Sequence, residues 1–461
     1  MKNIVKVGFC ILILGSALFP VMGYVTGYKT PNFQSSSFAQ FPDFIKDNQL
    51  NLTFTTEFDD YFSDQFPFRT FMISAYSGIN ELFFQQSGNE KVIVGRKGFL
   101  FFAETLNDYF KVNTLSDSDL IRLNNTLALQ NDYLARLGIV SYFMVAPNKA
   151  SIYGEYMPTY FKDIGERSNL DQLLSMDLAM PFIDLRTPIL AYKAKTDLKL
   201  YHLKDSHWNN LGAAVGYEEM LKALGYPSLS LLSQTPTLSV DWKGDLTTML
   251  YPSHVVYDQQ YNYALPEEFI FTRAIRDFDD LEIESTNKSR SGNLMMFRDS
   301  FANALVPFLS DSFGRVNYSR VFPYDYRKVE KLDPDQVVIE IAERNLNWLL
   351  QSTPILVVYP VKRLTKPSSD IISSYTVTQI EASGYSFLNV RYDDQSLGKQ
   401  ITSVRIVCDV GEYDAFPIYQ DADFEDDKIE YGFSLYTQNK LDLNEIDVLV
   451  EIEGKWLRIV R

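Results

Sequence analysis

Three residues in two short segments have the types and spacing that nucleophilic acyl transfer requires. Tyr201-His-Leu-Lys-Asp-Ser-His-Trp-Asn209 places a carboxylate, Asp205, two positions before an imidazole, His207. Leu294-Met-Met-Phe-Arg-Asp-Ser-Phe301 places Ser300 where an apolar strand is expected to end and a helix to begin. A serine nucleophile needs a base to accept its proton and a carboxylate to orient that base. Ser300 is therefore the candidate nucleophile, His207 the candidate base and Asp205 the candidate orienting group.

Each of these residues also has a purely structural interpretation. Ser300 stands where a serine often caps the following helix. His207 is one of three histidines in the chain, and a loop histidine can serve packing alone. The other two are His202, at an expected strand end, and His254, in a region of loops. An Asp-x-His pair combined with a serine at a strand end favours the catalytic interpretation of Asp205, His207 and Ser300.

The elements that must position these residues alternate between helix and strand. Apolar runs of strand length occur at 139–146, 294–297 and 336–341, and they suit strands that are buried on both faces. Leucines at helical spacing mark a helix over 120–137, and a second helix is expected over 301–309. This alternation predicts an α/β fold with a mostly parallel sheet and helices on both faces.

Changes in residue composition and pattern along the chain predict four parts. Residues 1–28 are expected to be a signal anchor and transmembrane helix, and residues 29–360 the catalytic domain. Short strands and loops suggest an insertion at about 226–290. Residues 361–369 are expected to be a linker, and 370–461 a small all-β sandwich, because only short strand-like segments separated by polar turns occur there.

The N-terminus has the pattern of a targeting segment. Lys2 and Lys6 precede an uncharged run over 7–28, which is long enough to span a hydrocarbon core of about 30 Å. The basic flank predicts a single-pass protein of the bacterial cell membrane whose remaining chain lies outside the cytoplasm. A cleaved signal peptide is the alternative. Cys10 lies in the apolar run and Cys408 stands alone beyond it, so no disulfide between them is expected.

Composition excludes some classes of partner. The net charge is −16 and no basic run occurs, so nucleic acid is not an expected partner. An anionic membrane surface would not be held by charge either. No Cys/His spacing typical of a metal site occurs, and the chemistry above needs no cofactor or metal.

The motifs resemble a known family. Asp205-Ser-His-Trp-Asn209 is similar to the signature of the AlgX/AlgJ-like and DHHW proteins, which are SGNH-hydrolase-like. The resemblance spans roughly residues 55–345. The further matching segments are Phe66-Pro-Phe-Arg69, Val94-Gly-Arg-Lys-Gly-Phe-Leu100, Ala146-Pro-Asn-Lys149 with Tyr153 and Pro158, and Asp299-Ser-Phe301. As in these families, the Asp-x-His pair precedes the serine, the reverse of the usual SGNH order, as a circular permutation would give.

The resemblance implies O-acetylation of an extracellular polysaccharide through an acyl-serine intermediate. It also implies a membrane-bound O-acyltransferase of the MBOAT type as the partner that delivers the acyl group. Ser300 would then be the nucleophile, His207 the base and Asp205 the orienting group. A carbohydrate esterase with the same three residues, and a noncatalytic polysaccharide-binding or scaffold protein, are the competing functions.

The oxyanion hole is less well defined by the sequence. Arg298 stands where the family often has glycine; it would pair with Asp299 or with a substrate carboxylate, or serve structure alone. The backbone N–H groups around Ser300 and Phe301 are the first candidates for the hole. Arg344 or Asn345 would add a side-chain donor, although both also suit an ordinary helix start.

Three more residues are candidates for substrate contact. Lys149 follows a strand expected to end at the same sheet edge, where it would orient a loop or bind substrate. Tyr153 and Trp208 would stack on sugar rings, or would pack in the core as aromatic residues more often do.

Overall fold

The computed structural model describes residues 6–7, 14–15, 18–19, 21–23, 25–28, 39–46, 49–162, 165–382, 384–421, 429–438 and 440–460. Most of the expected signal anchor therefore lies outside the described residues. Among the described residues, no helix has both the length and the apolar character needed to cross a membrane.

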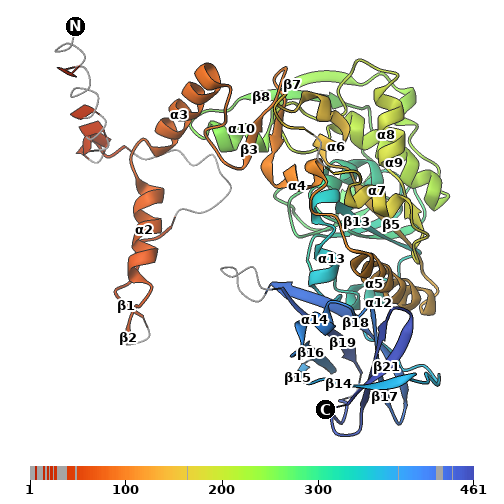
Figure 1. Ribbon diagram of the computed structural model, residues 1–461. Helices are drawn as coiled ribbons and strands as arrows, with labels where there is room; N and C mark the ends of the chain where they lie inside the picture. The colour runs from red at the N-terminus through yellow and green to blue at the C-terminus, as the bar shows by residue number, and fades with distance from the viewer. Residues whose placement is uncertain are drawn as a thin grey trace.

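The body of the protein is built on a mixed central sheet of seven strands in the order β6–β5–β13–β11–β12–β10–β9. Its strands β5 and β13 are labelled in Figure 1. From β6 to β12 all neighbouring strands are parallel, whereas β10 and β9 are antiparallel additions at one edge. The α/β class with a central sheet is thus confirmed. The strands are β5 (Val140–Ala146), β6 (Phe182–Ile183), β9 (Ile270–Phe271), β10 (Glu282–Thr286), β11 (Asn293–Phe297), β12 (Arg315–Ser319) and β13 (Gln336–Ala342).

Alternate residues of the central strands bury into two separate cores. In β11, Met295 and Phe297 join one core, while Leu294 and Met296 join the other. This alternation follows from the period of two residues in a strand and explains why the strand is apolar throughout. Helix α5 (Asp117–Arg136) packs on the first side and α9 (Asn210–Leu224) on the second.

The two long helices have clear sequence reasons for where they begin. Ser116 caps α5 in a capping box with Asp119. Asn209 caps α9 by accepting bonds from two backbone N–H groups, and Gly225 ends the helix at φ +74°. The cap of α9 directly follows the Asp205–Trp208 segment, so the start of that helix fixes one end of the candidate site.

Shorter helices and two hairpins complete the body. They are β3 (Val92–Val94), β4 (Leu100–Phe102), η1 (Ala103–Thr105), α4 (Leu106–Phe110), α6 (Lys149–Tyr153), η2 (Gly154–Tyr156), α7 (Asn169–Leu174), α8 (Arg186–Lys193), η3 (Leu231–Ser233), β7 (Thr237–Lys243), α10 (Asp245–Leu250), β8 (Tyr257–Asn262), η4 (Phe301–Leu305), α11 (Val306–Ser310), α12 (Arg327–Leu332), η5 (Glu343–Asn345) and α13 (Trp348–Gln351).

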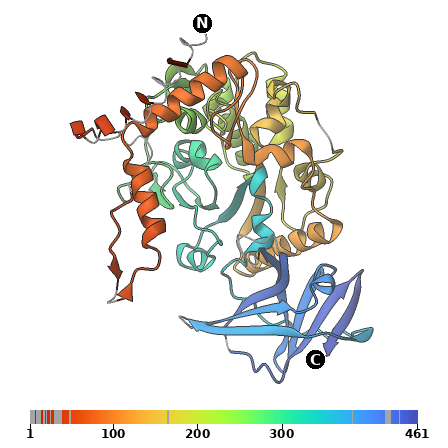
Figure 2. The same ribbon diagram turned by 60° about the vertical axis from the view of Figure 1, so that its left-hand side comes forward.

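An N-terminal arm projects from this body. It comprises the short pair β1 (Ile45–Lys46) and β2 (Gln49–Leu50), followed by α2 (Phe54–Gln65) and α3 (Arg69–Phe84). Helix α2 has no buried residue and stands away from the rest of the molecule, as both views show (Figures 1 and 2).

The C-terminal part is one curled sheet of eight strands in the order β14–β21–β20–β17–β18–β19–β16–β15. The expected two-sheet sandwich is therefore wrong. Strand β18 pairs with β17 along its first half and with β19 along its second, so a single sheet curls over its own core. The elements are β14 (Ser369–Ile372), β15 (Tyr375–Ala382), β16 (Tyr385–Tyr392), α14 (Gln395–Gly398), β17 (Ser403–Cys408), β18 (Gly411–Asp421), β19 (Ile429–Thr437), β20 (Asp447–Ile452) and β21 (Lys455–Val460).

Two segments lie differently from what the sequence suggested, although the domain boundaries themselves remain predictions. Within 226–290, strands β9 and β10 extend the central sheet. Within 361–369, the backbone of Val361 pairs with the backbone of Glu412 in the C-terminal sheet, and Thr365 donates two hydrogen bonds to the Glu412 carboxylate.

The first core of the central sheet continues without a break into the core of the C-terminal sheet. Arg122 of α5 crosses this junction: its guanidinium is 2% exposed and donates to the carbonyls of Gly398, Lys399 and Ile401. Asp119 in the same helix pairs with it at 2.6 Å.

We expect Arg122→Leu to lower the free energy of unfolding by about 2–4 kcal/mol, because the carbonyls of Gly398, Lys399 and Ile401 lose the hydrogen bonds from the guanidinium and Asp119 loses its partner. Arg276→Leu is the matched control, since the Arg276 side chain is 84% exposed; it should change stability by less than about 0.5 kcal/mol. Urea unfolding followed by circular dichroism measures both. Equal midpoints for the two variants would show that Arg122 does not hold the junction.

Candidate active site

The Asp205–Trp208 segment is a tight loop held at both ends. Tyr201 and Trp208 form an isolated antiparallel bridge, and the N–H of His202 donates to the carbonyl of His207. The buried indole of Trp208 donates its Nε1–H to the carbonyl of Phe301 at 2.8 Å. The loop is thus tied directly to the residue that follows Ser300.

Ser300 lies just beyond the end of β11, at the start of η4, as the sequence predicted. Its side chain makes no helix-capping hydrogen bond. Asp299 does that instead, because its Oδ1 accepts the N–H of Phe301 at 2.9 Å. Its Oδ2 accepts from the N–H of Ala342 and from the side chain of Asn345. The capping interpretation of Ser300 is therefore wrong, because its hydroxyl does not bind the backbone of the helix that follows.

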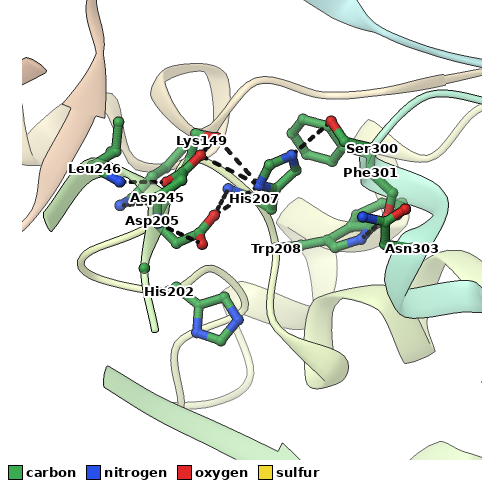
Figure 3. A network of polar contacts seen from close by, with 12 residues as sticks. Lys149, His202, Asp205, His207, Trp208, Asp245, Leu246, Ser300, Phe301 and Asn303 are labelled. Atoms are coloured by element: carbon green, nitrogen blue, oxygen red, sulfur yellow. Dashed lines mark hydrogen bonds and ion pairs between the residues drawn. The ribbon is translucent and has the colours of Figure 1, made fainter. Parts of the chain in front are cut away.

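The structure brings the three candidate residues into one row (Figure 3). The Ser300 Oγ lies 2.9 Å from His207 Nε2, and His207 Nδ1 lies 2.7 Å from Asp205 Oδ1. The His207 side chain is 21% exposed, whereas that of Asp205 is 5% exposed. These contacts match the order nucleophile, base and orienting carboxylate.

The Asp205 carboxylate accepts four hydrogen bonds. Oδ1 accepts from the backbone N–H and the ring Nδ1–H of His207. Oδ2 accepts from the indole Nε1–H of Trp242 at 3.0 Å and from the backbone N–H of Asp245 at 3.1 Å. Both oxygens are therefore saturated, and the carboxylate is fixed in the orientation that directs His207 Nε2 at the serine.

Asp245 is a second carboxylate at the same ring nitrogen, and sequence reasoning missed it. Its Oδ2 lies 3.7 Å from His207 Nδ1 and accepts from the hydroxyl of Ser206, while its Oδ1 accepts the N–H groups of Ser206 and Leu246. Trp242, which also stacks on His202, was missed as well. Both come from the region expected to be an insertion, at the end of β7 and the start of α10, and only the packing of these two elements against Asp205 reveals them.

The charges around His207 shift the pKa values of the group. Burial acts to lower the pKa of His207, but the adjacent Asp205 carboxylate outweighs it and the net pKa is raised. Burial acts to raise the pKa of Asp205, and the neighbouring His207 more than reverses this, so its pKa is lowered. Burial, and then the charge of Asp205, raises the pKa of Asp245 to about 6. Burial lowers the pKa of His202 to about 4, so His202 is neutral.

The ligand atoms of Asp205, His207 and Asp245 lie within 4.8 Å of one another, a spacing that a cation could bridge. The hydrogen bonds favour a cluster without a cation, because the Asp205 carboxylate already accepts four hydrogen bonds and His207 Nδ1 points at that carboxylate. We assign these side chains to orientation of the imidazole.

The side chains of Lys149 and Arg298 are both buried and donate hydrogen bonds to other parts of the protein. The ammonium of Lys149 is 3% exposed and donates to the carbonyls of Leu100, Leu203 and Asp205. All three of its protons are used, which leaves the loop-orienting role, and burial lowers its pKa to about 7. Arg298 donates to the Asp299 carbonyl, to the Asn303 side chain and to the carbonyls of the 278–280 turn. Among the described residues, Arg298 forms no ion pair with the Asp299 carboxylate, and its side chain is not exposed to solvent.

The two aromatic candidates for sugar stacking are buried. Tyr153 and Trp208 are each 1% exposed. Tyr153 packs among Phe99, Tyr156 and Tyr201 and accepts the N–H of Leu200. Of the two roles that the sequence left open, stacking on sugar rings is contradicted by this burial, and both residues pack in the core.

The expected oxyanion hole also needs correction. The N–H of Phe301 and the amide of Asn345 both donate to the Asp299 carboxylate, so neither is available. The N–H of Ser300 has no hydrogen-bond partner among the described residues. Arg344 lies with its guanidinium carbon 5.1 Å from the centre of the Phe301 ring, and that ring lies 4.9 Å from the His207 ring. These two groups are the remaining candidates for the hole.

Residues 92–255 match the family model described as "SGNH hydrolase-like domain, acetyltransferase AlgX". The matched region includes Asp205, His207 and Asp245 and ends before Ser300. No curated protein matches the chain significantly.

Several solved structures are similar in shape at low sequence identity. A DHHW family protein from Eubacterium siraeum is 18% identical, with 49% of this chain and 85% of that chain covered and a TM-score of 0.40. PatB1 from Bacillus cereus is 17% identical, with 55% and 96% covered and a TM-score of 0.42. The O-acetyltransferase domain of Pseudomonas putida AlgJ is 17% identical, with 55% and 91% covered and a TM-score of 0.36. The family match confirms the resemblance seen in the motifs: residues 92–255 are similar to the SGNH hydrolase-like domain of the AlgX acetyltransferase family model.

Proposed function

We propose that the protein is a polysaccharide O-acetyltransferase that works through an acyl-serine intermediate. The observation that carries this proposal is the row of contacts from Ser300 Oγ through His207 to Asp205, at 2.9 and 2.7 Å. The family match to an acetyltransferase domain supports the acyl group and the reaction class.

The chemistry follows from this geometry. Ser300 Oγ attacks the carbonyl carbon of the donor ester, and its proton passes to His207 Nε2. The tetrahedral oxyanion is stabilised by the Ser300 N–H and by the positive charge of Arg344. When the donor bond breaks, His207 returns the proton to the leaving oxygen, and the acetyl group remains on Ser300.

In the second half-reaction a sugar hydroxyl replaces water as the acceptor. His207 takes the proton of that hydroxyl as its oxygen attacks the acetyl-serine, and then returns the proton to Ser300 Oγ. The proposed setting is the outer face of a bacterial membrane, with an MBOAT-type protein as the donor of acetyl groups. The uncharged run over 7–28 supports the membrane setting.

We expect the protein to acquire one acetyl group on incubation with 4-nitrophenyl acetate, and Ser300→Ala to acquire none. Turnover of the ester should fall about 10⁴-fold or more in the variant, because the nucleophile is lost. Intact-mass spectrometry and release of nitrophenol measure the two effects.

Ser291→Ala is the matched control, since Ser291 is exposed before the opposite end of β11; it should behave as the native protein. An acetylated Ser300→Ala protein would overturn the assignment. Parallel assays with a free oligosaccharide and with an acetylated glycan then separate transfer from hydrolysis, because a carbohydrate esterase would turn over only the second.

The rate of ester turnover should rise with pH as His207 loses its proton, because only the neutral imidazole accepts the proton of Ser300. Since the pKa of His207 is raised, the inflection should lie above that of an ordinary histidine. Asp245→Asn removes a negative charge that raises this pKa, so the inflection should move to lower pH.

A pH profile of kcat/KM for 4-nitrophenyl acetate measures the shift. Asp241→Asn is the control, because Asp241 is exposed on β7 and does not face the imidazole. An unchanged inflection in Asp245→Asn would show that Asp245 does not act on His207.

A further inference from the structure

A shallow hollow of about 550 Å³ lies at the sheet edge that carries Ser300. It is lined by Leu281, Arg320, Val321, Phe322, Trp348 and Gln351. None of these residues belongs to the triad, and the sequence motifs did not mark any of them.

The topology of the central sheet places this hollow at the same sheet edge as the nucleophile. Trp348 follows β13 and Phe322 follows β12, and β11, which leads to Ser300, lies between those two parallel strands. The carboxyl ends of parallel strands meet at one edge, which is where open α/β sheets bind ligands. Helix α13, which carries Trp348, stands at this edge between the central and C-terminal sheets (Figure 1).

A short chain of hydrogen bonds joins the hollow to the Ser300 turn. Asn303, three residues after the nucleophile, donates to Asp279 at 2.7 Å. Arg320, which lines the hollow, donates to the same carboxylate oxygen at 2.6 Å. The wall of the hollow and the Ser300 turn therefore share one anchor.

The lining has the chemistry of a sugar platform. The rings of Phe322 and Trp348 lie 5.5 Å apart, and Trp348 is 41% exposed although it is large and apolar. The indole N–H of Trp348 and the amide of Gln351 have no hydrogen-bond partner in the part of the chain that the structure describes. Arg320 is neutralised by Asp279. Apolar faces rimmed by unused donors and acceptors suit a neutral pyranose, which has a C–H face and a hydroxyl rim.

We propose that this hollow, with Trp348 as its platform, binds a sugar residue of the acceptor polymer next to the residue that receives the acetyl group. The inference rests on the proposed function, because it concerns the acceptor of that reaction. It assigns polymer binding to residues separate from those that form the acyl-serine.

The test is affinity electrophoresis of the whole protein through gels containing the polysaccharide released from the surface of the producing cells, after mild base has removed its esters. We expect the polymer to retard the native protein, and Trp348→Ala to bind about tenfold more weakly, the effect of losing one aromatic contact. Trp348→Phe should keep most of the binding. Tyr76→Ala, at an exposed aromatic residue of the N-terminal arm, is the matched control and should bind normally.

Ester turnover and the acetyl adduct are measured on the same variants. Trp348→Ala should leave both within about twofold of the native protein, because Trp348 does not touch the triad. Native protein that is not retarded, or Trp348→Ala that is retarded equally, would overturn the subsite. Loss of ester turnover in proportion to polymer binding would overturn it too. Failure of the native protein to form the adduct would instead count against the acyl-serine mechanism and leave the binding result interpretable.

Discussion

The arrangement of the site depends on the saturated carboxylate of Asp205. Its four hydrogen bonds come from His207, Trp242 and Asp245, which belong to two segments separated along the chain. An ionised carboxylate with 5% of its side chain exposed is costly unless every lone pair is used. The same bonds that compensate this cost also fix the imidazole. The same contacts therefore satisfy the buried carboxylate and orient the imidazole, and both depend on the end of β7 and the start of α10 lying against Asp205.

Asp299 plays a comparable part on the other side of the nucleophile. By accepting from Phe301, Ala342 and Asn345, it joins the turn after β11 to the end of β13. The helix start is thus capped by the residue before the serine, and Ser300 keeps a free hydroxyl for His207. The arrangement removes one backbone donor from the oxyanion hole and leaves the N–H of Ser300, with the Arg344 charge nearby.

Much of the central sheet and the core of the site could be predicted from local sequence. The apolar run that ends before Ser300 is a buried strand because both of its faces are covered, and Asp-x-His is a contact that three residues can make by themselves. The contributions of Trp242 and Asp245 could not be predicted, because they depend on how β7 and α10, about 40 residues further along the chain, pack against the Asp205 segment. Whether Tyr153 and Trp208 contact substrate or pack in the core was left open by the sequence, since a single aromatic residue in a helix or loop has the same local pattern in either position. The sandwich was mispredicted because strand length and turn spacing do not reveal that β18 continues from one half of a curled sheet into the other.

The continuous core between α5 and the C-terminal sheet limits which other sheets could replace the C-terminal one. Arg122 donates to the backbone of the 398–401 turn and its guanidinium lies over the ring of Tyr431 in β19, so the contact depends on the position of that turn relative to α5. The C-terminal sheet is therefore not an interchangeable module. A different C-terminal sheet could replace this one only if it placed a turn of the same shape against Arg122. The shape of that turn and the position of α5 are therefore constrained together.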